Sequence, residues 1–202
     1  MEKRFSRESP EIRRRLLIEA AERCLAAHGI QGFTIDRICR EANVSRGLIS
    51  HYFAGKDELL AAVYRSALYG AIMGQVTVAA GGATPLLRLR AAIDAAFQPE
   101  TFQRSNLRVW LALWGEIAIN PKLQAVHRSL YRTYRARLAE EIAGVASERR
   151  LTVDAAGLAR NVIAMIDGLW LEWCLDPEAL APDDARRACL GLVEAKLGSL
   201  EV

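Results

Sequence analysis

Residues 34–56 constrain the fold more than any other stretch of the chain, because they read as two short helices joined by a tight turn. Thr34 can cap the first helix, since its hydroxyl can accept a hydrogen bond from a free amide of the first turn. Asn43 tolerates the left-handed backbone that such a turn needs. Ser45 can cap the second helix, which ends near Phe53. The stretch therefore predicts a helix-turn-helix.

The second of these helices leaves many hydrogen-bonding groups on one side. Its apolar residues, Leu48, Ile49 and Phe53, are predicted to be buried. Gly47 lowers helix stability by roughly 1 kcal/mol relative to Ala. One reason to keep a glycine there is the close approach of another backbone, and a DNA phosphate chain fits, because the second helix of this motif enters the major groove by its N-terminal end. The alternative is a helical hairpin inside an ordinary core.

Charge is distributed in agreement with a nucleic-acid partner at this end of the chain. The formal net charge of the 202 residues is only +3, too small for binding DNA by bulk charge. Residues 1–56 hold eleven Lys and Arg against seven Asp and Glu, a net of +4, so the remaining 146 residues sum to −1. The basic charge is therefore concentrated beside the helix-turn-helix.

At these residues the chain resembles the TetR family of transcriptional repressors. The resemblance rests on T-I-D-R-I-C-R-E-A-N-V-S-R-G-L-I-S-H-Y-F-A-G-K-D-E-L-L and extends from about Arg13 to Leu60. It implies a dimer that binds a palindromic DNA operator and responds to a small ligand. Arg46 and His51 would read or brace the major groove. The residues that would hold phosphates are Thr34, Ser45, Gly47, Tyr52 and Lys56.

The rest of the chain also reads as helical, so we expect an all-α protein of about nine helices. The head would span residues 9–56, with three helices and the helix-turn-helix at about 33–52. The body, residues 57–202, would bind the ligand and dimerise. Its helices are predicted at 57–78, 85–97, 105–119, 121–147, 152–175 and 182–200. By resemblance, the helix at 57–78 connects head and body.

Apolar side chains form a broad stripe on the last two predicted helices. In TetR-type proteins these two helices pair with those of a second subunit as a four-helix bundle, and the resemblance implies the same here. The alternative is that the stripe packs only inside one subunit, since an apolar face does not specify its partner. The predicted dimer-interface residues are Leu158, Val162, Met165, Ile166, Leu169 and Leu192.

Four tryptophans fall into two pairs at helical spacing, and carboxylates lie near them in the sequence. Aromatic faces with a nearby anion suit a quaternary ammonium ligand, because the ring quadrupole attracts a cation. Aromatic residues at this spacing are also typical of an ordinary core. The candidate ligand-binding residues are Trp110, Trp114, Glu116, Tyr131, Tyr134, Asp167, Trp170 and Trp173.

The body resembles in particular the BetI subgroup of the family, the choline-responsive repressors of glycine betaine synthesis genes. The stretches that carry this resemblance are N-L-R-V-W-L-A-L-W-G-E-I-A-I-N-P-K-L at 106–123 and I-D-G-L-W-L at 166–171. Choline is therefore the candidate effector. The alternative is a regulator of efflux or metabolic genes with a different lipophilic or cationic ligand.

Sequence motifs for catalysis are not found. The chain has no phosphate-binding glycine loop, no nucleophile elbow and no metal-ligand spacing, so we expect no enzyme, no cofactor and no metal. The four cysteines sit in helical apolar patterns and are expected to be free thiols, which suits a cytoplasmic protein. No apolar run is long enough for a membrane span, and the N-terminus lacks the features of a signal peptide.

Overall fold

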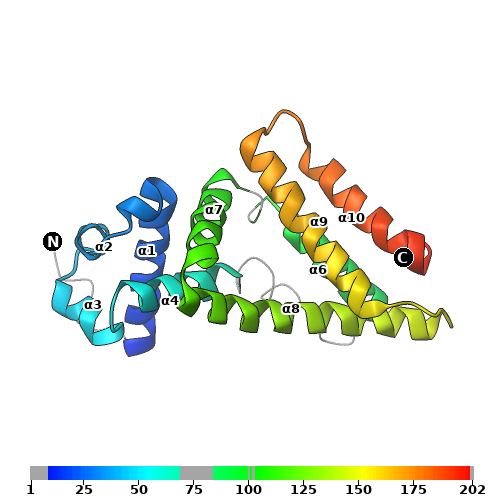
Figure 1. The fold of residues 1–202 in the computed structure, drawn as a ribbon, viewed down its shortest axis with the longest axis horizontal. Coiled ribbons are helices and arrows are strands. Elements are labelled where there is room, and N and C mark those ends of the chain that lie inside the picture. The colour runs from blue at the N-terminus through cyan, green and yellow to red at the C-terminus, as the bar shows by residue number, and fades with distance from the viewer. Residues whose placement is uncertain (1–8, 69–83, 100, 102, 201–202) are drawn as a thin grey trace. The chain divides into compact units, whose positions relative to one another are not determined.

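A computed structural model describes residues 9–68, 84–99, 101 and 103–200. Within these residues the secondary structure consists of nine α-helices without a strand, which confirms the all-α fold class. Figure 1 shows these helices coloured in chain order. None of the described helices is both long enough and apolar enough to cross a membrane. The chain divides into two compact units, residues 1–67 with 108–126, and residues 68–107 with 127–202.

The first unit begins with α1 (Pro10–Gly32), whose start follows from its sequence. The Ser9 hydroxyl accepts a hydrogen bond from the Ile12 amide at 3.3 Å, and Pro10 occupies the first turn, where its missing N–H costs nothing. Helix α1 has a kink at Gly29. Gly29 has a φ of 61°, and one further helical turn follows it.

The helix-turn-helix consists of α2 (Ile35–Ala42) and α3 (Arg46–Tyr52), with the predicted caps in place. The Thr34 hydroxyl accepts from the Arg37 amide, and the Ser45 hydroxyl accepts from the Leu48 amide, both at 3.4 Å. Asn43 adopts the left-handed conformation, with a φ of 54°. The two capped helices and the left-handed turn between them confirm the helix-turn-helix. Each cap joins residues three apart, so it depends little on the rest of the fold.

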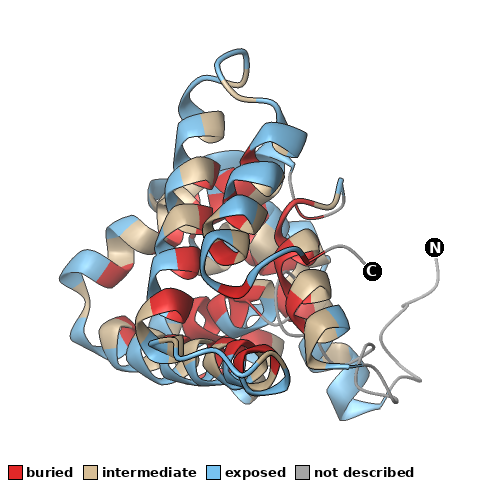
Figure 2. Ribbon diagram, turned by 90° about the vertical axis from the view of Figure 1, so that its right-hand side faces the viewer, coloured by how far each residue is buried: buried red, intermediate tan, exposed pale blue. Residues whose placement is uncertain are grey.

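A single apolar core holds the three head helices together. The fully buried side chains at its centre come from α1, α2, α3 and the connections between them: Leu17, Leu25, Phe33, Ile38, Ile49 and Phe53. Figure 2 shows buried positions in red along the helices, with exposed positions in pale blue. Such burial supplies most of the stability of helices this short, which are marginal in isolation.

Helix α4 (Lys56–Leu68) follows the head directly and packs within the first unit. Its Tyr64 meets Trp110 of α7 (Arg104–Ile119) edge to face, with ring centroids 5.8 Å apart. Both rings are buried. The part of the predicted helix 57–78 beyond residue 68 lies outside the described residues.

The second unit contains α6 (Pro85–Ala96), most of α8 (Pro121–Glu148), α9 (Ala155–Leu175) and α10 (Pro182–Leu197). Helix α10 packs against both α9 and α6. A Cβ added at Gly144 of α8 would lie 2.8 Å from Pro85, so glycine permits the close approach of α6 and α8. An ion pair between Arg88 and Glu141, at 2.9 Å, joins the same two helices.

Two helix ends in this unit differ from the predicted bounds by more than one residue, each for a local reason. Helix α9 begins at Ala155 rather than Thr152, because the Asp154 carboxylate caps it by accepting from the Gly157 amide at 2.9 Å. Helix α10 ends at Leu197 rather than Leu200. Gly198 follows with a φ of 81°, a conformation that stops the helix.

Candidate functional site

Helix α3 turns its polar side chains outward. Ile49 is buried and Tyr52 is half-buried, while Arg46, Gly47 and His51 are exposed. The His51 ring meets Tyr52 edge to face, with centroids 5.0 Å apart. Two further predicted DNA-binding residues, Thr34 and Ser45, are exposed at the N-termini of α2 and α3. The predicted DNA-binding residues of the head thus leave hydrogen-bonding groups at the surface.

Gly47 has no packing reason to be glycine. Among the described residues, a Cβ built there would have one neighbour within 4 Å, the Ser45 hydroxyl at 3.8 Å, which is an ordinary contact. Its φ is not in the left-handed region. The space over Gly47 is therefore open to a partner outside the chain, which fits the close backbone approach inferred from its position.

The residue that the sequence did not single out is Asp36, the second residue of α2. Its carboxylate pairs with the Arg46 guanidinium on α3 through both oxygens, with Arg46 donating from Nε and Nη2. The Arg46 hydrogen bonds hold the pKa of Asp36 below its usual value, and Asp36 raises the pKa of Arg46. The pair joins residues ten apart on two helices, so helical periodicity offers no signal for it.

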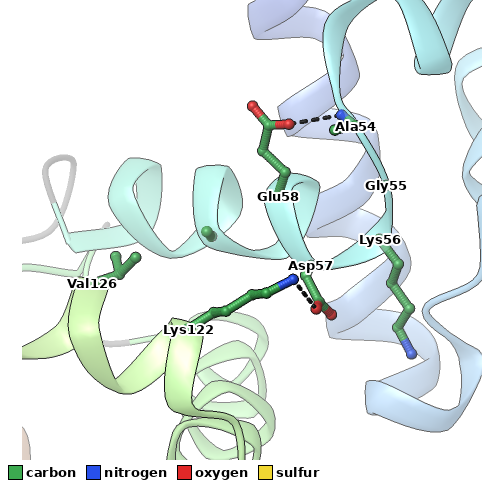
Figure 3. Close-up of a pocket in the computed structure, with 8 residues that line it drawn as sticks. Ala54, Gly55, Lys56, Asp57, Glu58, Lys122 and Val126 are labelled. Atoms are coloured by element: carbon green, nitrogen blue, oxygen red, sulfur yellow. Dashed lines mark hydrogen bonds and ion pairs between the residues drawn. The ribbon is translucent and has the colours of Figure 1, made fainter.

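Lys56 lies at the start of α4, beside a cleft of about 590 Å³ in the first unit (Figure 3). The Glu58 carboxylate accepts from the Ala54 amide at 2.7 Å and closes the first turn of the helix. Lys122 of α8 forms an ion pair with Asp57 at 3.7 Å. In Figure 3 Lys56 points away from this pair, so its exposed ammonium is directed to the solvent.

In the second unit, Tyr131 and Asp167 form the polar centre of an aromatic cluster. Tyr131 of α8 donates its hydroxyl to the carboxylate of Asp167 on α9, at 3.3 and 3.2 Å. The His127 ring lies 4.2 Å from the Tyr131 ring, and Tyr134 meets Tyr131 edge to face at 6.2 Å. These contacts bring together three of the predicted ligand-binding residues.

Burial perturbs both acids of this cluster. Desolvation raises the pKa of Asp167 to about 6, although the Tyr131 hydrogen bond opposes the shift. Burial also raises the pKa of Tyr134 well above its usual value, and the nearby Asp167 adds to the effect. A half-buried carboxylate in an aromatic setting is a group that a ligand cation would stabilise.

Trp170 is a core residue of the second unit. Its side chain is 1% exposed, and its indole N–H donates to the backbone carbonyl of Ala96 at 3.0 Å. That hydrogen bond ties α9 to the end of α6. Trp173, three residues later, is half-buried. The two tryptophans of this pair are therefore not equivalent, although their spacing made them equal candidates.

The other aromatic pair belongs to the first unit. Trp110 is buried, and Trp114 is half-buried with its ring 5.9 Å from that of Trp110. Glu116, also half-buried, follows on the same helix. Of these three predicted ligand-binding residues, Trp110 packs against Tyr64 in the core of its unit.

The predicted dimer-interface residues differ in how far their side chains are exposed. Leu158, Val162 and Ile166 of α9 are buried within the second unit, so their side chains keep little surface for a partner. The other three are half-buried: Met165, Leu169 and Leu192. The more exposed leucines of α9 are Leu171 and Leu175, the latter 72% exposed.

A helix-turn-helix head on an all-α body defines a class of DNA-binding transcriptional regulators, and comparison with known proteins agrees. Residues 17–63 match the profile of the bacterial regulatory proteins of the tetR family. Residues 85–198 match that of the C-terminal region of BetI-type transcriptional repressors. The chain belongs to the TetR family of transcriptional regulators.

Within this family its body is of the BetI type, and both sequence and structure relatives support this. The regulator BetI 1 of Chromohalobacter salexigens is 36% identical over 191 residues, which cover 92% of this chain and 91% of that protein. BetI of Burkholderia mallei is 36% identical over 171 residues, 84% of this chain and 86% of that protein.

Two solved structures extend the comparison to the fold. A transcriptional regulator from Pseudomonas aeruginosa PAO1 superposes with a TM-score of 0.82 at 37% identity, over 95% of this chain and 93% of that one. A transcriptional regulator from Saccharomonospora viridis, solved in complex with choline, has a TM-score of 0.77 at 25% identity, over 91% and 96% of the two chains. The predicted resemblance to the TetR family and its BetI subgroup is confirmed.

Proposed function

We propose that this TetR-family repressor binds a two-fold symmetric operator as a dimer and responds to a quaternary ammonium effector, choline being the first candidate. The observation that carries the effector assignment is the Asp167 carboxylate held by Tyr131 inside an aromatic cluster. A cation gains from both the carboxylate and the ring faces. The effector would act by binding one conformation of the body better than another, which shifts the population able to bind DNA.

DNA binding would be divided between two kinds of contact. Thr34, Ser45, Gly47, Tyr52 and Lys56 would meet phosphates, while Arg46 and His51 would face the bases. Phosphate contacts fix the register of the protein on DNA, and base contacts specify the sequence. The exposed polar side of α3 and the open space at Gly47 support this assignment.

Dimerisation would use the outward sides of α9 and α10. Helix α10 exposes small residues at helical spacing, Ala188, Gly191 and Ala195, and α9 exposes Ala164 and Gly168 in the same way. Small side chains allow two helices to approach closely. Two heads on a two-fold axis could then reach successive major grooves, roughly 34 to 36 Å apart.

The effector proposal is tested by fluorescence polarisation of a labelled operator, titrated with choline, glycine betaine and 3,3-dimethylbutanol. The last compound has the shape of choline without its charge, and glycine betaine adds a carboxylate that Asp167 would repel. We expect choline to change the DNA affinity at a lower concentration than either. An equal response to 3,3-dimethylbutanol would contradict a role for the charge.

A different lipophilic or cationic effector is the second candidate. It is favoured by the half-buried Trp114 and Trp173, which offer apolar ring surface beyond what choline needs. An operator affinity that does not change with choline but changes with a larger aromatic cation would support this second candidate.

A further inference from the structure

The two helices of the helix-turn-helix are joined by a contact that reaches the first residue of α3. The Asp36 carboxylate accepts from Nε and Nη2 of Arg46, one oxygen for each nitrogen. Both side chains lie at the surface, with 60% of Asp36 and 68% of Arg46 exposed. An ion pair this exposed contributes little to folding stability, so stability is a weak reason for it.

The atoms used in this pair leave a defined edge of Arg46 available. A guanidinium carries five N–H groups in a planar fork. The N–H of Nε and one N–H of Nη2 bind Asp36. Both N–H groups of Nη1 and the second N–H of Nη2 remain. At the end of the guanidinium, one N–H of Nη1 and the remaining N–H of Nη2 point in the same direction. A pair of parallel donors of this kind matches O6 and N7 of guanine in the major groove.

A carboxylate among DNA-facing residues also needs a reason, because phosphates repel it. Asp36 is exposed in the first turn of α2, and hydrogen bonding to Arg46 lowers its pKa and favours the ionised form. An arginine that is already held on one side loses less conformational freedom when it binds a base. Asp36 can therefore lower affinity for phosphate in general and still favour one base.

We propose that Asp36 is a positioning residue that holds Arg46 with its free edge available to a guanine, one in each half-site of the operator. This inference rests on the proposed placement of α3 in the major groove. It makes Asp36 a determinant of sequence specificity rather than of affinity. Arg46→Ala and Asp36→Ala should then affect the same base pair.

The test uses an operator selected from a randomised DNA library by the full-length protein. Each guanine of the half-site is replaced in turn by 7-deazaguanine, which lacks the N7 acceptor but keeps the base pair. We expect one position at which wild-type affinity falls about tenfold, the range for one bidentate base contact. That penalty should be nearly absent in Arg46→Ala and strongly reduced in Asp36→Ala.

The matched control is Glu41→Ala. Glu41 is an exposed carboxylate on the same helix, and it pairs with Arg23 of α1 at 2.9 Å rather than with α3. Both variants remove one negative charge, so both should bind random DNA slightly tighter. Only Asp36→Ala should lose discrimination between operator and random DNA, by about fivefold to tenfold. Asp36→Ala combined with Arg46→Ala should discriminate no worse than Arg46→Ala alone.

The competing explanation is that Asp36 only competes with DNA for Arg46. Asp36→Ala would then tighten binding to the operator at least as much as to random DNA, and the 7-deazaguanine penalty would persist. Either result overturns the inference, as does a wild-type protein with no sensitive guanine. If circular dichroism shows that Asp36→Ala does not fold, Asp36→Asn replaces it with the same expectations. Failure of the wild-type protein to select any operator would instead contradict the proposed function itself.

Discussion

Tyr131 of α8 donates its hydroxyl to both carboxylate oxygens of Asp167 on α9, at 3.3 and 3.2 Å. The two residues are 36 positions apart in the sequence and meet beside His127, whose ring is tilted against that of Tyr131. The contact places an acid whose pKa is about 6 among aromatic rings. Its protonation state near neutral pH can therefore be altered by a small change in pH or by a bound cation.

Choline affinity should depend on pH through Asp167. Because burial raises the pKa of this carboxyl to about 6, Asp167 is charged above that pH and neutral below it. We expect choline to bind progressively more weakly as the pH falls from 7.5 to 5, approaching a tenfold loss per unit below the pKa. Isothermal titration calorimetry without DNA measures this. The same titration on Asp167→Asn should show weak binding that is independent of pH.

The same carboxylate should make folding stability depend on pH in a predictable direction. The folded-state pKa of about 6 lies above the reference value of 3.8, so the folded protein binds the proton more tightly than the unfolded chain. The contribution of Asp167 to the free energy of unfolding is fully present below about pH 4. It falls by on the order of 3 kcal/mol as the pH rises through 6. Asp167→Asn should therefore be more stable than wild type at pH 7.5.

Urea denaturation at pH 7.5 and at pH 4.5 measures this difference. The advantage of Asp167→Asn should shrink at the lower pH, where wild-type Asp167 is protonated. Tyr131→Phe is the companion variant. It removes the hydrogen bond that favours the ionised form, so the pKa of Asp167 should rise further. A pH-independent difference between Asp167→Asn and wild type would argue against the raised pKa.

Trp170→Phe should destabilise the second unit. The substitution removes the indole N–H that donates to the Ala96 carbonyl and leaves that buried acceptor without its partner. We expect a loss of about 2 to 4 kcal/mol from the unmet hydrogen bond and the lost volume. Thermal unfolding measures it, and the half-buried Trp173→Phe should lose less. Unchanged stability with lost choline binding would instead make Trp170 a ligand contact.

Gly191→Glu should weaken dimerisation without unfolding the subunit. A Cβ at Gly191 of α10 meets no atom of the described residues within 4 Å, and glycine is a poor helix former, so the isolated subunit tolerates the side chain. A charged side chain in the proposed interface should raise the monomer fraction in analytical ultracentrifugation and lower operator affinity. Gly115→Glu on α7 is the matched control, because a Cβ there is equally clear of the part of the chain that the structure describes. A dimeric Gly191→Glu would show that α10 does not carry the interface.

Lys56→Ala should weaken binding to all DNA sequences by a similar factor. Removing one phosphate contact should reduce the slope of log affinity against log salt by about 0.9. Gel shifts at several salt concentrations measure it. Lys122→Ala is the control, because Lys122 is an exposed lysine of the same unit whose ammonium pairs with Asp57. An equal effect of the two variants would mean that the change reflects bulk charge alone.

Much of the head could be predicted because its signals are local. Ser9, Thr34 and Ser45 each bond to an amide three residues away, so the residue type and its spacing suffice to place a helix start. The left-handed Asn43 belongs to the same class of signal. The other predicted helices of the body also exist within the described residues, with ends that differ by a few residues where Asp154 and Gly198 intervene, whereas the predicted helix at 57–78 is described only as far as Leu68.

The sequence by itself determined the class of protein. It also determined most of the helices, the helix-turn-helix and the candidate residues for DNA binding. Only the tertiary structure decided which of two tryptophans, Trp170 or Trp173, is core, and that Val162 is covered within its own unit. It also created the Asp36–Arg46 and Tyr131–Asp167 contacts. The physical reason is that capping is settled between neighbours in the chain, whereas burial and pairing depend on which distant helix covers a given face.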